Sequence, residues 1–309
     1  MEIPIFIVDA FTNLPFKGNP AAVCLLNHEL RDELYQKIAA EINLSETAFI
    51  TADKPSVDFT KGSRFNLRWF TPTTEVNLCG HATLASAAVL FKHKQNMNST
   101  VVFETRSGDL SVVQQGEDLV MDFPLNPPTK QVPDQFTELI MVSKTNICHC
   151  SFLLGVFMLC VLQASVGDHP VQDVYFNANT KKLLLRLEDT CDRSVLTGLQ
   201  VKPDALLSSD KSGRVKGLIV TMKGSPDCQP SYDFYSRYFS PWNGIPEDPV
   251  CGSAHTVLAS YWSEELGKKK MLAFQCSGRG GELQLELRED GRLNIAGKSV
   301  TVLQGTITL

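Results

Sequence analysis

The chain lacks a surplus of positive charge. Its 309 residues include 29 Lys and Arg against 34 Asp and Glu, which gives a formal net charge of −5 at pH 7. Non-specific binding of nucleic acid needs a basic surface, so we expect no nucleic-acid partner. Hydrophobic residues make up 43% of the chain and charged residues 20%, a globular composition that excludes wholesale disorder.

The sequence also lacks the marks of export and of membrane insertion. Residues 1–9 have no basic region ahead of their short apolar run, which a signal peptide would show. The nine Cys are an odd number, and without secretion unpaired thiols indicate a reducing compartment. The apolar run at 147–162 has 16 residues, whereas a spanning helix needs about 20. We therefore expect a cytoplasmic protein with no membrane contact.

Motifs for common cofactors and metals are missing as well. The sequence contains no Gly-x-Ser-x-Gly elbow and no Gly-x-Gly-x-x-Gly after a predicted strand. The cluster Cys148-His149-Cys150 has no second Cys/His pair at the spacing of a zinc site. The sequence therefore predicts neither a cofactor nor a metal.

An internal repeat is the strongest feature that is present. Residues 65–72 (Phe-x-x-Arg-Trp-Phe-Thr-Pro) match 234–241 (Phe-x-x-Arg-Tyr-Phe-Ser-Pro), and 79–82 (Cys-Gly-His-Ala) match 251–254 (Cys-Gly-Ser-Ala). A predicted helix, a strand and a glycine turn follow each copy in the same order. Because a repeat of about 170 residues is a duplicated domain rather than a solenoid, we predict two αβ units related by a pseudo-twofold axis.

Composition along the chain suggests where these units lie. Four prolines within 124–133 predict a linker, so we expect one αβ unit at 1–125 and the second at 126–299. Apolar residues four apart predict an amphipathic helix at 29–42. The segment 81–91 has apolar or small residues on every side, which predicts a helix buried all round.

Each repeat places a Cys-Gly pair just before a predicted helix. The start of a helix has free N–H groups and a positive dipole end, which suits the carboxylate of a small substrate. The same field is expected to lower the pKa of the thiols of Cys79 and Cys251. If the pseudo-twofold axis brings both into one cleft, two acid/base groups would face each other across a substrate. The alternative is that both are small buried thiols without a chemical role.

Three other side chains are candidates for proton transfer. Glu46 lies where a predicted helix meets a strand, which favours a general base over a capping role with Asn43. Asp248 lies three residues before the second Cys-Gly pair, and a helix-stabilising role is its alternative. His81 directly follows Gly80, and a structural role is its alternative.

Six short motifs together resemble the PhzF family of phenazine-biosynthesis isomerases: Asp9-Ala-Phe11, Gly18-Asn19-Pro20, Asn43-Leu-Ser-Glu46-Thr47, Phe70-Thr-Pro72, Gly80-His81 and Asp248-Pro-Val-x-Gly-Ser253. The resemblance implies an α+β fold of the diaminopimelate-epimerase-like type. That fold has two pseudo-twofold-related halves, each a mixed β-sheet rolled around a central helix, with the active site between them. It further implies that the last strand, 300–309, joins the first half.

The resemblance also implies roles for individual residues. Glu46 would be the acid/base that moves a proton on a small carboxylate-bearing substrate, with His81 and Asp248 assisting and no cofactor taking part. The substrate-binding positions would be Ser45, Gly80, Gly252, Ser253 and Asn19. Members of this family are expected to form homodimers.

Two departures from the family pattern leave alternatives open. Cys79 and Cys251 precede the two glycines, as in diaminopimelate epimerase and proline racemase, so a two-thiol racemase or epimerase is an alternative. A further alternative is a non-catalytic binding protein that engages a WD-repeat partner. About 20 residues around 141–162 look extra relative to the family, and we predict an insertion there.

Overall fold

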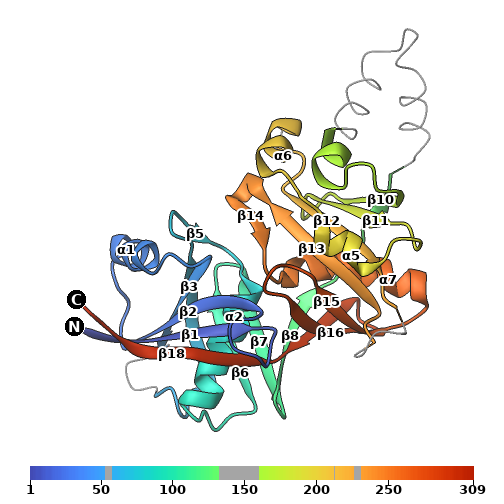
Figure 1. Ribbon diagram of the computed structural model, residues 1–309. Coiled ribbons are helices and arrows are strands. Elements are labelled where there is room, and N and C mark those ends of the chain that lie inside the picture. The colour runs from blue at the N-terminus through green and yellow to red at the C-terminus, as the bar shows by residue number, and fades with distance from the viewer. Residues whose placement is uncertain (53–57, 132–159, 212, 226–230) are drawn as a thin grey trace, which may run out of the picture.

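The computed structural model describes residues 1–52, 58–131, 160–211, 213–225 and 231–309. The predicted insertion at 141–162 lies almost wholly outside the described residues. Two halves are visible in Figure 1, one in blue to green and one in yellow to red. Within the described part of the chain, no helix is both long enough and apolar enough to cross a membrane.

The first half consists of strands, a surface helix and a central helix. Its strands are β1 (Glu2–Ala10), β2 (Asn19–Leu26), β3 (Glu46–Ala52), β4 (Arg64–Phe70), β5 (Glu75–Val76), β6 (Thr100–Thr105), β7 (Gly108–Gln115) and β8 (Asp118–Pro124). Its helices are α1 (Asp32–Ile42) and α2 (Gly80–Ala88), which continues as the π-helix η1 (Val89–His93). Helix α1 begins later than predicted, because the backbone N–H of Leu30 donates to the Tyr35 hydroxyl in the lead-in.

The second half has the same order of strands around its own central helix. Its strands are β10 (Val171–Asn177), β11 (Lys182–Leu187), β12 (Gly217–Lys223), β13 (Phe234–Ser240), β14 (Ile245–Asp248), β15 (Lys270–Gln275), β16 (Gly281–Leu287) and β17 (Arg292–Gly297). Its helices are α5 (Arg193–Gly198), α6 (Pro203–Ser209), the 3-10 helix η2 (Pro241–Asn243) and the central α7 (Gly252–Leu266).

Strand pairing confirms that the sequence repeat is a repeat of structure. In the first half β2 runs parallel to β3, β3 antiparallel to β4, and β4 parallel to β6. The second half repeats this with β11, β12, β13 and β15. The matched segments 65–72 and 234–241 therefore occupy equivalent strands, and the α+β class with two pseudo-symmetric halves is confirmed.

Each half also receives a strand from the far side of the boundary. The final strand β18 (Ser299–Thr308) pairs antiparallel with β1, so the two chain ends lie side by side (Figure 1). In the second half, β9 (Thr129–Lys130) pairs with β10, and β8 pairs with β17 across the junction. The proline-rich segment is thus not a bare linker, because Thr129 and Lys130 lie between its prolines and are free to pair.

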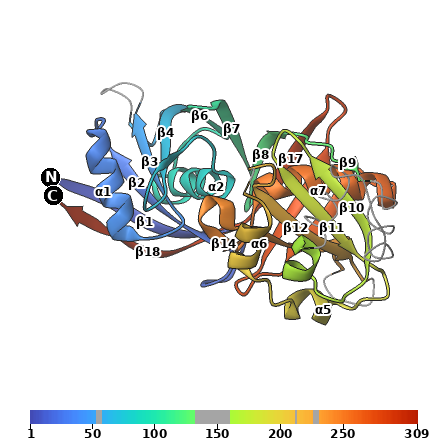
Figure 2. The same cartoon turned by 90° about the horizontal axis from the view of Figure 1, so that it is seen from above.

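The central helices are buried as the all-round apolar pattern of 81–91 predicted. Residues His81 to Ala88 of α2 are all buried, and so is α7 from Ala254 to Trp262. Figure 2 shows α2 in the middle of the strands of the first half and α7 inside the second. Small residues on α2 allow the sheet to close around it on every side. The two helices begin at the junction of the halves, where their first turns meet.

Candidate active site between the two halves

A cleft of about 530 Å³ lies where the two central helices begin, and both halves line it. The first half contributes Glu46, from the start of β3, and the first turn of α2. The second half contributes Asp248, from the end of β14, and the first turn of α7. The residues predicted for chemistry that line this cleft are Glu46, Cys79, Gly80, His81, Asp248, Cys251, Gly252 and Ser253. The fold thus brings together segments separated by about 170 residues.

The two helix starts approach each other at their glycines. A Cβ added to Gly80 would lie 3.3 Å from Phe123 Cζ and 3.9 Å from the Cα of Gly252. The side chain of any other residue would therefore crowd this position. The first N–H groups of each helix have no acceptor within the helix and carry the positive end of its dipole. A carboxylate held between Gly80 and Gly252 would receive hydrogen bonds from both halves.

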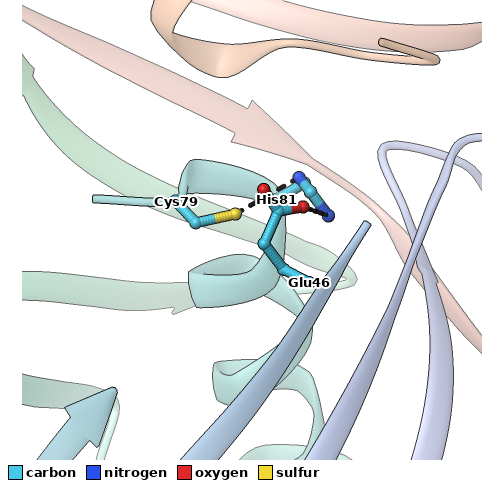
Figure 3. Close-up of side chains that lie close together, drawn as sticks. All are labelled: Glu46, Cys79 and His81. Atoms are coloured by element: carbon cyan, nitrogen blue, oxygen red, sulfur yellow. Dashed lines mark hydrogen bonds and ion pairs between the residues drawn. The ribbon is translucent and has the colours of Figure 1, made fainter. Parts of the chain in front are cut away.

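Glu46, His81 and Cys79 form a buried cluster on one wall of the cleft (Figure 3). Glu46 Oε2 lies 3.3 Å from His81 Nε2, and Cys79 Sγ lies 3.4 Å from His81 Nδ1. Among the described residues, Glu46 Oε2 accepts no well-aligned hydrogen bond. The three donor atoms lie within 4.8 Å of one another, so this cluster could also hold a metal ion such as Zn²⁺.

His81 is held as a neutral imidazole. Its complete burial lowers its pKa, while the charge of Glu46 and a hydrogen bond to the carbonyl of Pro20 partly oppose the shift. A neutral ring has one donor and one acceptor nitrogen. Nδ1 lies next to the Cys79 thiol and Nε2 next to the Glu46 carboxylate, so the ring lies between these two groups.

Asn19, a predicted substrate-binding residue, has a completely buried side chain that does not line the cleft. Its amide donates to Asp248 Oδ1 at 2.6 Å and to the carbonyl of Val250 at 2.9 Å. These two bonds use both amide hydrogens, although the amide nitrogen also lies 3.2 Å from His81 Nδ1. Asn19 is therefore a positioning residue. Ser45 is also outside the lining, with its hydroxyl 3.5 Å from His81 Nε2.

Gln275 fixes the turn between Asp248 and the start of α7, and the sequence analysis missed it. Its side-chain amide donates to the carbonyl of Asp248 at 2.6 Å and accepts from the N–H of Cys251 at 2.9 Å. Gln275 has no exposed surface. No local motif could have revealed this role, because Gln275 ends a strand that reads as an ordinary core element.

The electrostatics of the cleft bring the pKa of Asp248 close to neutral pH. Burial and the negative charge of Glu46 raise the pKa of Asp248 to about 7, against opposing hydrogen bonds from Cys251 and Asn19. A group whose pKa is close to the working pH can both release and accept a proton efficiently. Asp248 thus has the electrostatic property expected of an acid/base residue.

Stability is expected to depend on pH through Asp248. The folded protein keeps the carboxyl protonated up to a pKa of about 7, whereas an unperturbed Asp ionises near 3.8. Between these values the folded state binds more protons, so stability falls as pH rises. The unfolding free energy of wild type minus that of Asp248→Asn should therefore fall by up to about 1.4 kcal/mol for each pH unit of increase.

Chemical denaturation of both proteins at several pH values measures this difference. Burial lowers the pKa of His255 to about 4, so this residue makes stability rise with pH over part of the same range. Both proteins contain His255, so its contribution cancels in the difference between them. A difference that stays flat from pH 4 to pH 7 would show that Asp248 titrates normally.

The two cysteines reach the cleft, but the structure reverses the expected direction of their pKa shifts. Burial, joined by the charge of Glu46, raises the pKa of Cys79 well above its usual value. Burial and the charge of Asp248 raise the pKa of Cys251 to about 12. The predicted helix-dipole effect is too small to offset desolvation by complete burial together with nearby carboxylates. Neither thiol is ionised at neutral pH in the free protein.

Two pseudo-symmetric rolls that enclose a buried acid/base cleft define the diaminopimelate-epimerase-like class, in which isomerase-like proteins are found. A family model described as "Phenazine biosynthesis-like protein" (PhzC-PhzF) matches residues 8–305. The chain therefore belongs to the PhzC-PhzF family. The resemblance seen in the sequence motifs is confirmed.

Relatives of this family resemble the chain over its whole length. The phenazine biosynthesis-like domain-containing protein 1 of Mus musculus is 53% identical, and an uncharacterized isomerase of Pseudomonas aeruginosa is 38% identical, each over 100% of both chains. A PhzF-family crystal structure from Enterococcus faecalis matches with a TM-score of 0.80 and 35% identity over 100% of both chains. A hydroxyproline epimerase from Agrobacterium vitis shares the fold, with a TM-score of 0.56 and 10% identity over 99% of this chain and 92% of that one.

Proposed function

We propose that this protein is a cofactor-independent isomerase that moves a proton on a small carboxylate-bearing substrate, with Glu46 as the acid/base. The observation that carries this proposal is the position of Glu46. Its buried carboxylate lines the cleft, next to a neutral His81 and with one oxygen free of aligned hydrogen bonds among the described residues. The isomerase name of the Pseudomonas aeruginosa relative agrees with this chemistry.

The geometry suggests how the proton would move. The substrate carboxylate binds at the starts of α2 and α7, which also stabilise the negative charge that develops when a neighbouring C–H bond breaks. Glu46 takes a proton from a carbon next to a C=C bond of the substrate, and the electron pair of that C–H bond delocalises over the C=C bond and the carboxylate conjugated with it. A proton then returns to a different carbon, from Glu46 or from Asp248. His81, whose Nε2 lies 3.3 Å from Glu46 Oε2, positions the Glu46 carboxylate.

Solvent exchange tests this proposal directly. Wild-type protein is incubated in D₂O with a panel of amino acids and cyclic hydroxy acids, and mass spectrometry detects incorporated deuterium. We expect incorporation into at least one compound of the panel. Absence of exchange with every compound would contradict the proposal and favour the binding-protein alternative, in which a WD-repeat protein or a second copy of the chain is the partner.

A two-thiol racemase is the second candidate, because Cys79 and Cys251 are matched N-cap residues of the two central helices and both line the cleft. Their raised pKa values disfavour it. We expect the double variant Cys79→Ser/Cys251→Ser to keep its exchange rate within about tenfold of wild type, because Glu46 carries the proton. The same mass-spectrometric assay measures this rate. Complete loss of exchange in the folded double variant would instead assign the chemistry to the thiols.

A further inference from the structure

The cleft contains a buried lysine that the proposed reaction does not use. Lys182 begins β11, and its side chain lines the cleft although the residue is only 7% exposed. Lysine is almost never buried to this degree unless it is paired. The sequence analysis missed Lys182, because it stands in Lys181-Lys182 beside an apolar strand and reads as an ordinary strand end.

Within the described part of the chain, the ammonium of Lys182 has neither an ion-pair partner nor a hydrogen-bond acceptor. The ring of Tyr238 lies next to it, with its centroid 5.8 Å from Nζ. Asp248 is the carboxylate of the same half that lines the cleft, but its Oδ1 is already bound to the Asn19 amide. Burial lowers the pKa of Lys182, and the charges of Asp248 and Cys251 oppose that shift only in part.

A buried cation without a partner is costly, so its position calls for an anion that arrives with the ligand. Lys216 lines the same cleft and adds a second positive charge from the second half. Glu46, by contrast, belongs to the first half. The two lysines that line the cleft therefore come from β11 and from the segment before β12, in the half that also contributes Asp248.

We propose that Lys182 binds a second acidic group of the substrate, so that the cleft selects dicarboxylates over monocarboxylates and amino acids. The inference rests on the proposed function in one respect, which is that the first carboxylate binds at the helix starts. The helix starts and Lys182 then hold the two acidic groups of one ligand. The volume of about 530 Å³ is suited to a small ligand of this kind. An amino acid fits less well, because its ammonium group would be repelled by the lysines.

Calorimetric titration with two matched probes tests this inference. Cyclohex-4-ene-1,2-dicarboxylate carries two acidic groups, and cyclohex-3-ene-1-carboxylate carries one on the same ring. A charge-assisted hydrogen bond to a buried ammonium should favour the dicarboxylate in wild type by about 10- to 100-fold in Kd. Lys182→Met should remove this preference and leave the Kd of the monocarboxylate within about twofold. Lys182→Arg, which retains the charge, should keep part of it.

Lys181→Met is the matched control, because it removes the same charge from the neighbouring residue, which is exposed and does not line the cleft. This variant should retain the wild-type preference. Melting temperatures establish whether each variant is folded. If Lys182→Met does not fold, the dicarboxylate preference of Lys182→Arg is compared with that of wild type instead.

The outcomes separate this inference from the proposed function. Equal binding of both probes to wild type would overturn the role of Lys182 and leave the carboxylate site at the helix starts intact. A dicarboxylate preference that survives in Lys182→Met would also overturn it. Loss of proton exchange in Lys182→Met with an unchanged preference would show Lys182 to be a base instead. If neither probe bound to wild type, both proposals would be contradicted.

Discussion

Replacing Glu46 with Gln is expected to lower the rate of solvent proton exchange by about 10²- to 10⁴-fold, the contribution typical of a positioned acid/base group. Gln has nearly the same shape as Glu, so binding at the helix starts should persist. It cannot accept a proton from carbon at neutral pH. Deuterium incorporation measured by mass spectrometry, with the most active compound of the panel, gives the two rates.

A second readout separates catalysis from structural damage in Glu46→Gln. The charge of Glu46 is one of the causes that raise the pKa of Asp248, so removing it should lower that pKa below about 7. Infrared titration of the buried carboxyl group measures this shift. A chemically inert Glu46 would give the same pKa shift with no loss of exchange.

Glu41→Gln is the matched control for this experiment. Glu41 is exposed on α1, far from the cleft lining, so the same change of charge there should leave exchange unaltered. Exchange that persists in Glu46→Gln but disappears in the double cysteine variant would contradict the role of Glu46. The chemistry would then belong to the two thiols.

Gly18→Ala is expected to destabilise the protein by more than about 3 kcal/mol, since it combines backbone strain with a clash. Gly18 has a φ of +65°, and a Cβ there would lie 2.1 Å from the backbone oxygen of Ala10. Its N–H donates to the carbonyl of Gly280 at 2.7 Å, which ties the loop before β2 to the second half. Because backbone rather than a flexible side chain blocks the new methyl group, the loop itself must move.

Exchange should fall in Gly18→Ala as well, because the next residue is Asn19, which donates to Asp248. Chemical denaturation gives the loss of stability, and the D₂O assay gives the loss of activity. The two effects together would show that this loop holds the acid/base residues of both halves in place.

Gly116→Ala separates the cost of the clash from the cost of the backbone conformation. Gly116 has a φ of +64°, nearly that of Gly18, but a Cβ there would meet nothing within 4 Å. We expect this control to lose about 1 kcal/mol and no activity. Equal losses in the two variants would mean that the loop adjusts freely and does not hold Asn19.

Local pattern determined much of the architecture. The buried central helix at 81–91 could be predicted because a helix without a polar side has no stable position at a surface. The duplication could be predicted because matched motifs recur in one order, and equivalent strands carry them in the structure. Position in the sequence and the family motifs pointed to Glu46, His81 and Asp248, and all three line the cleft.

The tertiary structure alone decided the environment of those residues. Burial determines the direction of the pKa shifts of Cys79 and Asp248, and no sequence pattern predicts that each residue is left less than a tenth exposed. Asn19 donates to Asp248, which lies 229 positions away in the sequence, so only the fold could show that Asn19 positions this carboxylate.

Gln275 and Lys182 became visible for the same reason. Each stands at the end of a strand, and the adjacent sequence contains no motif that marks it. The role of Gln275 follows from its bond to Cys251, and that of Lys182 follows from its position in the cleft lining. The sequence by itself therefore determined the duplicated αβ unit, the buried helix at 81–91 and the candidate acid/base groups, because these depend on local periodicity, repetition and short motifs. Only the fold determined the protonation, the hydrogen-bond partners and the exposure of the side chains at the cleft, because these properties depend on which distant segments pack around each side chain and shield it from water.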